Sequence, residues 1–103
     1  MTTELNSNNF EDFIKDGVVL VDFFADWCMP CKMMAPIINE FGEKFQGRAK
    51  VGKVDVEHNQ ELAQKFNVSS IPNFILFKDG EVVEQFVGGM SVEDLSEKLE
   101  RHV

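Results

Sequence analysis

The sequence has 103 residues, of which 44% are hydrophobic, including ten phenylalanines. We expect residues 1–103 to form a single domain, whose apolar content supplies a core without a structural metal. The formal net charge is −8, which argues against nucleic acids and anionic membranes as partners because their phosphates repel an acidic surface. No run of 18 apolar residues occurs, so we expect no transmembrane span.

The first ten residues contain no basic residue and no apolar segment of the kind found in secretory signal peptides. We therefore expect the protein to remain in the cytoplasm. In that reducing compartment a pair of cysteines is rarely a structural disulfide.

The first third of the chain predicts a strand, a helix and a second strand. A short strand-like stretch at 2–5 precedes a helix that we expect to be capped by Asn8 together with Glu11 and to end at Gly17. The run at 18–25 is apolar apart from one aspartate, which is typical of a strand buried on both faces of a sheet.

The middle of the chain predicts a long helix, a strand and a short helix. Residues 30–46 carry apolar side chains at helical spacing. We expect a kink at Pro36, because proline lacks an N–H and its ring clashes with the preceding turn. A strand at 51–56 and a short helix capped by Asn59 follow.

The last third predicts a hairpin and a helix. Two apolar runs, 73–77 and 81–87, are separated by a short turn that ends in Asp79-Gly80, a strong hairpin signal. Ser91 with Asp94 resembles a capping box for the final helix. The predicted order is therefore β-α-β-α-β-α-β-β-α, an α/β fold class.

Both cysteines, Cys28 and Cys31, lie in one Trp-Cys-Met-Pro-Cys-Lys motif, where the buried strand ends and the long helix begins. A stabilising disulfide is one interpretation, but closing so small a ring gives only about 2 kcal/mol. A zinc site is another, but zinc requires four ligands and there is no second such motif. The two histidines, His58 and His102, stand alone in the sequence, so we expect them to be solvated and expect no metal site.

A redox pair explains the motif best. Two cysteines three positions apart at the start of a helix are close enough to form a reversible disulfide. Cys28 is expected to cap the helix, where unpaired N–H groups favour its thiolate. Cys31, inside the first turn, is expected to be more buried and to keep its proton. This asymmetry predicts one attacking and one resolving thiol.

The segment 21–32, which reads VDFFADWCMPCK, resembles the active-site segment of the thioredoxin family. The resemblance continues along the whole chain, in order, through Ala35-Pro36, Lys53-Val54-Asp55, Ser70-Ile71-Pro72, the stretch 77–80 and Val87-Gly88. It implies a thioredoxin fold, with a central five-stranded mixed sheet flanked by four helices. It also implies a protein-disulfide reductase that is recharged by a separate thioredoxin reductase. No GxGxxG fingerprint occurs, so we expect no nicotinamide or flavin cofactor.

The resemblance also implies roles for individual residues. Cys28 would attack a substrate disulfide and Cys31 would resolve the mixed disulfide. Asp22, whose burial in an apolar strand should raise its pKa, would be the acid or base that serves Cys31, tuned by Lys53. The alternative is that Asp22 is a structural carboxylate paired with Lys53.

By the same resemblance, Pro72 would form a cis peptide bond and Ile71 would offer backbone groups to an extended substrate peptide. The residues expected to bind substrate are Trp27, Met29, Pro30, Ile71, Pro72, Gly88 and Gly89.

The sequence departs from the family pattern at three positions. Met29 stands where most members carry glycine, which leaves the redox potential open, and Phe24 and Asn73 replace a common Trp and Thr. Two alternatives remain. One is a disulfide isomerase or oxidant, against which Met29-Pro30 and the absence of a signal peptide argue, and the other is a binding subunit that retains the fold. We expect a monomer whose partners are disulfide-bonded proteins and a reductase.

Overall fold

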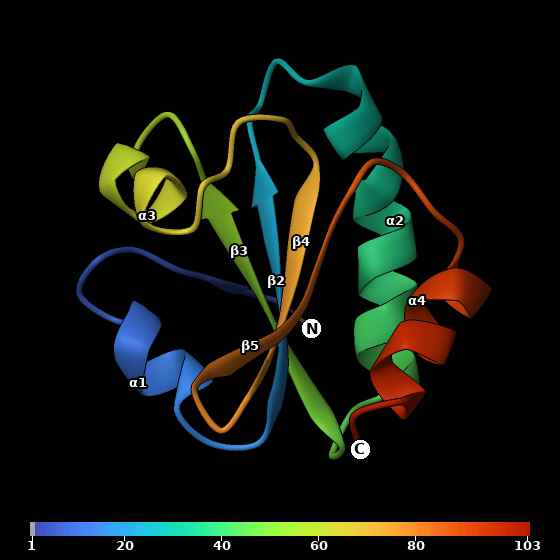
Figure 1. The fold of residues 1–103 in the computed structure, drawn as a ribbon. Helices are drawn as coiled ribbons and strands as arrows, with labels where there is room; N and C mark the ends of the chain where they lie inside the picture. Colours follow the sequence, from blue (N-terminus) through green and yellow to red (C-terminus); the bar gives the residue numbers. More distant parts are fainter. Residues whose placement is uncertain (1) are drawn as a thin grey trace.

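The computed structural model describes residues 2–103 (Figure 1). Its elements follow the predicted order, and their bounds agree with the predicted ones to within three residues, those of the strand at 81–87 without any difference. In chain order they are β1 (Thr3–Glu4), α1 (Phe10–Ile14), β2 (Val18–Phe24), α2 (Met29–Lys44), β3 (Ala49–Asp55), α3 (Gln60–Lys65), β4 (Asn73–Lys78), β5 (Glu81–Val87) and α4 (Val92–Glu100).

The five strands form one mixed sheet in the order β1-β3-β2-β4-β5. β3 runs parallel to both β1 and β2, whereas β4 is antiparallel to β2 and β5. Helices α1 and α3 lie on one face of the sheet, and α2 and α4 lie on the other (Figure 1). The predicted five-stranded mixed sheet flanked by four helices is confirmed.

The central strand β2 sends alternate side chains to two separate cores. Val19, Val21 and Phe23 belong to the cluster that includes Phe10 of α1. Val18 and Leu20 instead belong to the cluster that includes residues of α2 and α4. The continuous apolar run of β2 is thereby explained, because both faces of this strand are buried.

This alternation determines which way Asp22 faces. Asp22 has the same parity as Val18 and Leu20, so its side chain lies on the face covered by α2. Only 1% of Asp22 is exposed. The single charged residue of β2 is therefore buried beneath the helix that carries the cysteines.

The predicted caps have different outcomes: the cap of α1 is wrong, the cap of α4 is confirmed, and Asn59 precedes α3 as expected but makes no side-chain capping bond. Asn9, not Asn8, precedes α1, and its side chain makes no capping bond. The Asn6 carboxamide oxygen instead accepts the backbone N–H groups of Asn8 and Asn9, because a short polar side chain competes for such donors in a turn. At α4, the Ser91 hydroxyl accepts the N–H of Asp94 as expected, at 3.1 Å.

Candidate active site

Helix α2 begins at the motif that contains both cysteines. Cys28 is the N-cap residue in an extended conformation, and its Sγ accepts the backbone N–H of Cys31 at 3.2 Å. Pro30 occupies a position in the first turn, where a missing N–H costs no helical hydrogen bond. The prediction that Cys28 caps this helix is confirmed.

Cys28 and Cys31 are joined by a disulfide, with their Cα atoms 5.2 Å apart. The expected difference in burial between them is wrong for this oxidised form, because Cys28 is 5% exposed and Cys31 is 6% exposed. The bond draws both side chains into one small apolar cluster with Ala25, and Phe24 and Ile71 pack against it.

The loop before β4 lies next to this cluster. The peptide bond between Ile71 and Pro72 is cis, as the family resemblance implied. Gly88 adopts a φ of +99°, a conformation that favours glycine, and its N–H donates to the Pro72 carbonyl oxygen at 2.9 Å. The end of β5 is thereby held against the cis-proline loop.

Asp22 and Lys53 occupy paired positions on neighbouring parallel strands. In the stretch 2–103, however, Asp22 takes part in no ion pair within 4.0 Å, and its Oδ1 atom is buried without a hydrogen-bond partner from the protein. The Lys53 ammonium lies 4.7 Å from the centroid of the Phe24 ring, where the ring face attracts it. The structure therefore contradicts the alternative interpretation, in which Asp22 is a structural carboxylate paired directly with Lys53.

Burial raises the pKa of Asp22 to about 7, while the positive charge of Lys53 acts in the opposite direction. Removal from water disfavours the ionised carboxylate, and no donor compensates the lost hydration at Oδ1. A carboxyl group with a pKa near neutrality can both donate and accept a proton under ordinary conditions. The predicted direction of this shift is confirmed.

A small cavity of about 120 Å³ opens beside the disulfide, and its lining includes Cys31, Lys53 and Lys32. It brings together the end of β2, the first turns of α2 and one residue of β3. Asp22 is not among the lining residues. The structure thus gathers the second cysteine and the lysine, with the buried carboxylate adjacent to the lysine on the sheet.

The residues expected to bind substrate differ in their accessibility. Trp27 and Met29 are each 64% exposed. Pro30 and Gly89 are exposed as well, whereas Pro72 is buried. Ile71 and Gly88 are half-buried.

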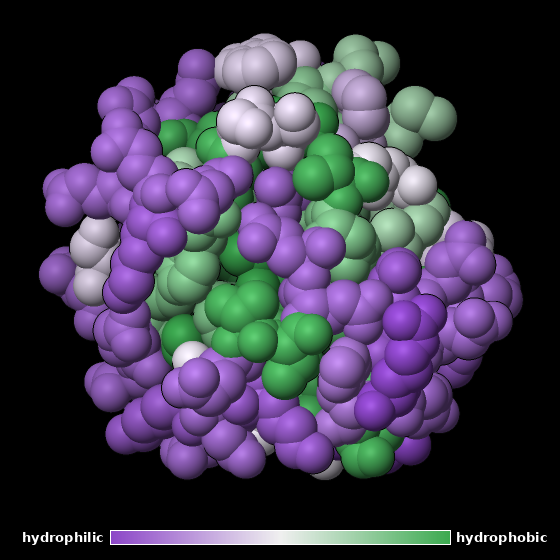
Figure 2. All heavy atoms as spheres, viewed as in Figure 1, coloured by the Kyte–Doolittle hydropathy of each residue, from purple (hydrophilic) through white to green (hydrophobic). Residues whose placement is uncertain are grey.

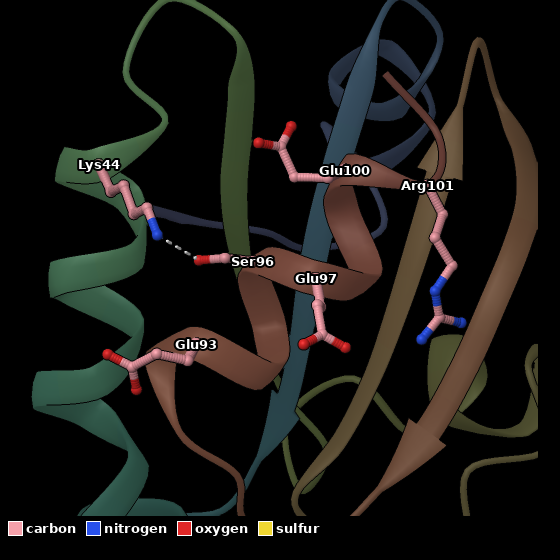
Figure 3. Close-up of a pocket in the computed structure, with 6 residues that line it drawn as sticks. All are labelled: Lys44, Glu93, Ser96, Glu97, Glu100 and Arg101. Carbon is pink, nitrogen blue, oxygen red and sulfur yellow. Dashed lines mark hydrogen bonds between the residues drawn. The ribbon is translucent and has the colours of Figure 1, made fainter.

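A separate hollow of about 460 Å³ lies between α4 and the C-terminal end of α2 (Figure 3). The Lys44 ammonium donates to the Ser96 hydroxyl there at 3.0 Å, and the remaining lining is charged. Lys44 is 13 residues beyond Cys31, about 20 Å along the helix. This hollow is therefore not part of the redox site.

The described residues also bear on metals and membranes. No group of three or more His, Cys, Asp or Glu side chains in the stretch 2–103 is arranged to hold a metal ion. Within the same stretch, no helix has the length and apolar content needed to cross a membrane.

The interpretation of His102 as solvated is wrong. Its Nε2 lies 2.9 Å from Glu84 Oε1, and the side chain is only 23% exposed. His58 is exposed as expected, although its Nδ1 lies 3.0 Å from an Asp55 oxygen. The sequence could not reveal the contact of His102, because it joins the C-terminal tail to β5.

The adjacent methionines Met33 and Met34 differ in exposure, so a packing role fits Met34 but not Met33. Met33 is 70% exposed one turn beyond Met29, whereas Met34 is buried. The Met34 Sδ accepts the N–H of Met90 at 3.4 Å, which links α2 to the loop after β5. Met29 and Met33 are four residues apart in the sequence, a spacing that places them on one face of a helix.

Comparison with known proteins agrees with this geometry. The family model described as Thioredoxin matches residues 1–101. A thioredoxin of Staphylococcus saprophyticus is 47% identical over 97% of this chain and 96% of its own length, and one of Staphylococcus haemolyticus is 46% identical over the same shares. The solved structure of a mutant thioredoxin from Halobacterium salinarum is 37% identical and covers 98% of this chain and 89% of its own, with a TM-score of 0.91. The chain belongs to the thioredoxin family.

Proposed function

We propose that this thiol-disulfide oxidoreductase reduces disulfides in other proteins through Cys28 and Cys31, and that a separate reductase recharges it. The observation that carries the proposal is the position of Cys28 Sγ at the start of α2, where it accepts the N–H of Cys31. The same N–H and the helix dipole stabilise a thiolate at this atom, and the thiolate is the reactive form.

The reaction proceeds in two exchanges. The Cys28 thiolate attacks one sulfur of the substrate disulfide, a mixed disulfide forms, and the other substrate sulfur leaves as a thiolate that takes up a proton. Cys31 then loses its proton and attacks Cys28 Sγ, which releases the second substrate sulfur as a thiol. The substrate gains two electrons and two protons, and Cys28 and Cys31 end in the disulfide seen here.

We assign Asp22 the role of proton acceptor for Cys31 in the second exchange. Its pKa of about 7 suits this role, and its side chain faces the helix that carries Cys31. Lys53 acts on Asp22 through its charge, since it lowers the pKa that burial raises. Both assignments follow the family resemblance at these positions.

The substrate is proposed to lie across the exposed side chains around Cys28. Trp27 and Met29 offer the apolar contact area. Ile71 offers backbone groups to an extended peptide, next to the cis bond with Pro72. Pro30, Gly88 and Gly89 complete the proposed surface.

The partners proposed for this chain are disulfide-bonded proteins and a thioredoxin reductase. A reductant functions where its own dithiol is recharged, so we place it in the reducing cytoplasm. We propose that residues 1–103 act as a single domain and as a monomer. The acidic net charge of −8 supports partners other than nucleic acids.

The test uses single-cysteine variants with a disulfide-bonded protein such as insulin, and dithiothreitol as the electron source. Cys28→Ser should abolish catalysed reduction. In a separate reaction without dithiothreitol, pre-reduced Cys31→Ser should accumulate a mixed disulfide with the substrate, because no resolving thiol is present. Full turnover by either variant would contradict the assigned roles. If the chain with both cysteines replaced by Ser still binds its partner, this result would favour the binding-subunit alternative.

A further inference from the structure

Large apolar side chains are exposed beside the disulfide. Of the six such side chains in residues 2–103, three lie within one seven-residue stretch: Trp27, Met29 and Met33. Single exposed apolar residues are ordinary on protein surfaces. A cluster next to a reactive disulfide, on a chain whose net charge is −8, indicates a contact surface.

Met29 and Met33 share one face of α2. Met29 is the first residue of the helix, and a residue four positions later lies on the same face, about 6 Å away. Over the first turns of α2, at the upper right of the space-filling view, Figure 2 shows moderately hydrophobic atoms at the surface. Ile37, four residues further, is partly buried against the core, so the stripe is exposed only near the disulfide.

The neighbouring Met34 shows that this exposure does not come from residue type alone. Met34 is 2% exposed, and its sulfur accepts the N–H of Met90. Met33 is 70% exposed. Methionine is unbranched and polarisable, and therefore adapts to partner side chains of different shape.

We propose that Met29 and Met33 form a specificity stripe that selects substrates with an apolar side chain about two residues from the attacked cysteine. The inference rests on the proposed function, because the occupant is an extended segment of a disulfide-bonded protein. The stripe is continuous with the reacting sulfur, since Met29 directly follows Cys28. Met33 lies five residues beyond Cys28, about 7.5 Å along the helix, a distance that an extended peptide covers in about two residues.

The experiment compares two disulfide-linked peptide homodimers, identical except for Leu or Ser at the second residue on each side of the cysteine. Oxidised glutathione serves as a small disulfide that ends before it reaches the stripe. The unmodified chain should reduce the Leu peptide with a kcat/KM about five- to tenfold above that for the Ser peptide, in line with the partial burial of one apolar side chain.

Met33→Ser should lower the Leu-to-Ser ratio to about one to two and leave the rate with oxidised glutathione unchanged. Met33→Leu should keep the preference. Val82→Ser is the matched control, because Val82 is an exposed apolar residue on β5 at the end of the sheet away from the disulfide. This control should behave as the unmodified chain.

Two results would overturn the inference while leaving the proposed function standing: equal rates with both peptides, or a preference that Met33→Ser does not change. An equal loss of rate with peptides and glutathione in Met33→Ser would also overturn it, because the residue would then act on the disulfide itself. Failure of the unmodified chain to reduce any protein disulfide would overturn both.

Discussion

Asp22 and Lys53 lie directly opposite each other on β2 and β3, yet the ammonium lies over the Phe24 ring rather than on the carboxylate. Lys53 therefore acts on Asp22 as a nearby charge and not as a hydrogen-bonding partner. Such an arrangement leaves the carboxyl group with a pKa of about 7, whereas a close ion pair would lower it.

The raised pKa of Asp22 has a consequence for stability. In the unfolded chain an aspartate titrates near pH 4, whereas Asp22 in the folded chain titrates near pH 7. Between about pH 4 and pH 7 the folded protein therefore binds one proton more than the unfolded chain. The free energy of unfolding must therefore fall as pH rises through this window. The Asp22→Asn variant has no titrating group at this position, so its stability does not fall in this pH window. At pH 8 it should be more stable than the unmodified chain by up to about 4 kcal/mol.

Urea denaturation of both proteins at pH 4 and pH 8 measures this difference. At pH 4 it should be small, because Asp22 is protonated in the folded chain. A stability difference of the same size at both pH values would contradict the assigned cause.

Lys53→Met should raise the pKa of Asp22 above 7, because the substitution removes the cation that opposes the effect of burial. The titration of the Asp22 carboxyl carbon, followed by NMR, measures the shift. Lys50→Met is the matched control: Lys50 is on the same strand, but its ammonium donates to the Phe13 carbonyl oxygen on the other face of the sheet. An unchanged Asp22 titration in Lys53→Met would contradict the role of this lysine.

Met29→Gly should make the disulfide easier to reduce while turnover is preserved. Met29 is the first residue of α2, and glycine there loses more backbone freedom when the ring is closed, at a cost of about 0.5–1 kcal/mol. This amount corresponds to a potential higher by about 10–20 mV. Met29→Ala serves as the control, since it shortens the side chain without loosening the backbone. Equal potentials for the glycine variant and the unmodified chain would show that Met29 does not tune the pair.

Glu84 on β5 anchors the C-terminal end of the chain. Its carboxylate lies within 3.4 Å of Lys98, Arg101 and His102, and the hydrogen bond with His102, followed by the nearby cations, lowers the pKa of Glu84. The stabilisation is therefore present above the pKa of an unfolded glutamate and is lost as pH falls through the lower folded value.

Glu84→Gln should reduce the free energy of unfolding by about 1 kcal/mol at neutral pH, with a smaller effect near pH 3. Amide hydrogen exchange in the last turn of α4 should become faster. Glu81→Gln, on the same strand but fully outside this cluster of charges, should change neither quantity. A pH-independent loss would indicate a packing role for Glu84 instead.

The regular elements could be predicted because the local patterns agree with the fold. The apolar run of β2 reflects burial on both faces, and the Asp79-Gly80 turn has a positive φ at both residues, as a tight hairpin requires. The cap of α1 could not be predicted because the side chains of Asn6 and Asn9 both accept backbone N–H groups within one short turn.

The site could be predicted only in part. The capping thiol and the raised pKa of Asp22 follow from position and burial. The equal burial of the two cysteines and the contact of Lys53 with Phe24 depend on side-chain packing across segments. The same holds for the pairing of His102 with Glu84, which no local pattern encodes.

The reduction potential of the Cys28–Cys31 pair tests the central claim most directly. Trp27 is the only tryptophan and the chain has no tyrosine, so its fluorescence across thiol–disulfide buffers reports the adjacent pair. The account predicts a single transition with a midpoint near about −270 mV, the range of a disulfide reductant. A midpoint near about −180 mV, typical of an isomerase, or no transition at all would contradict it.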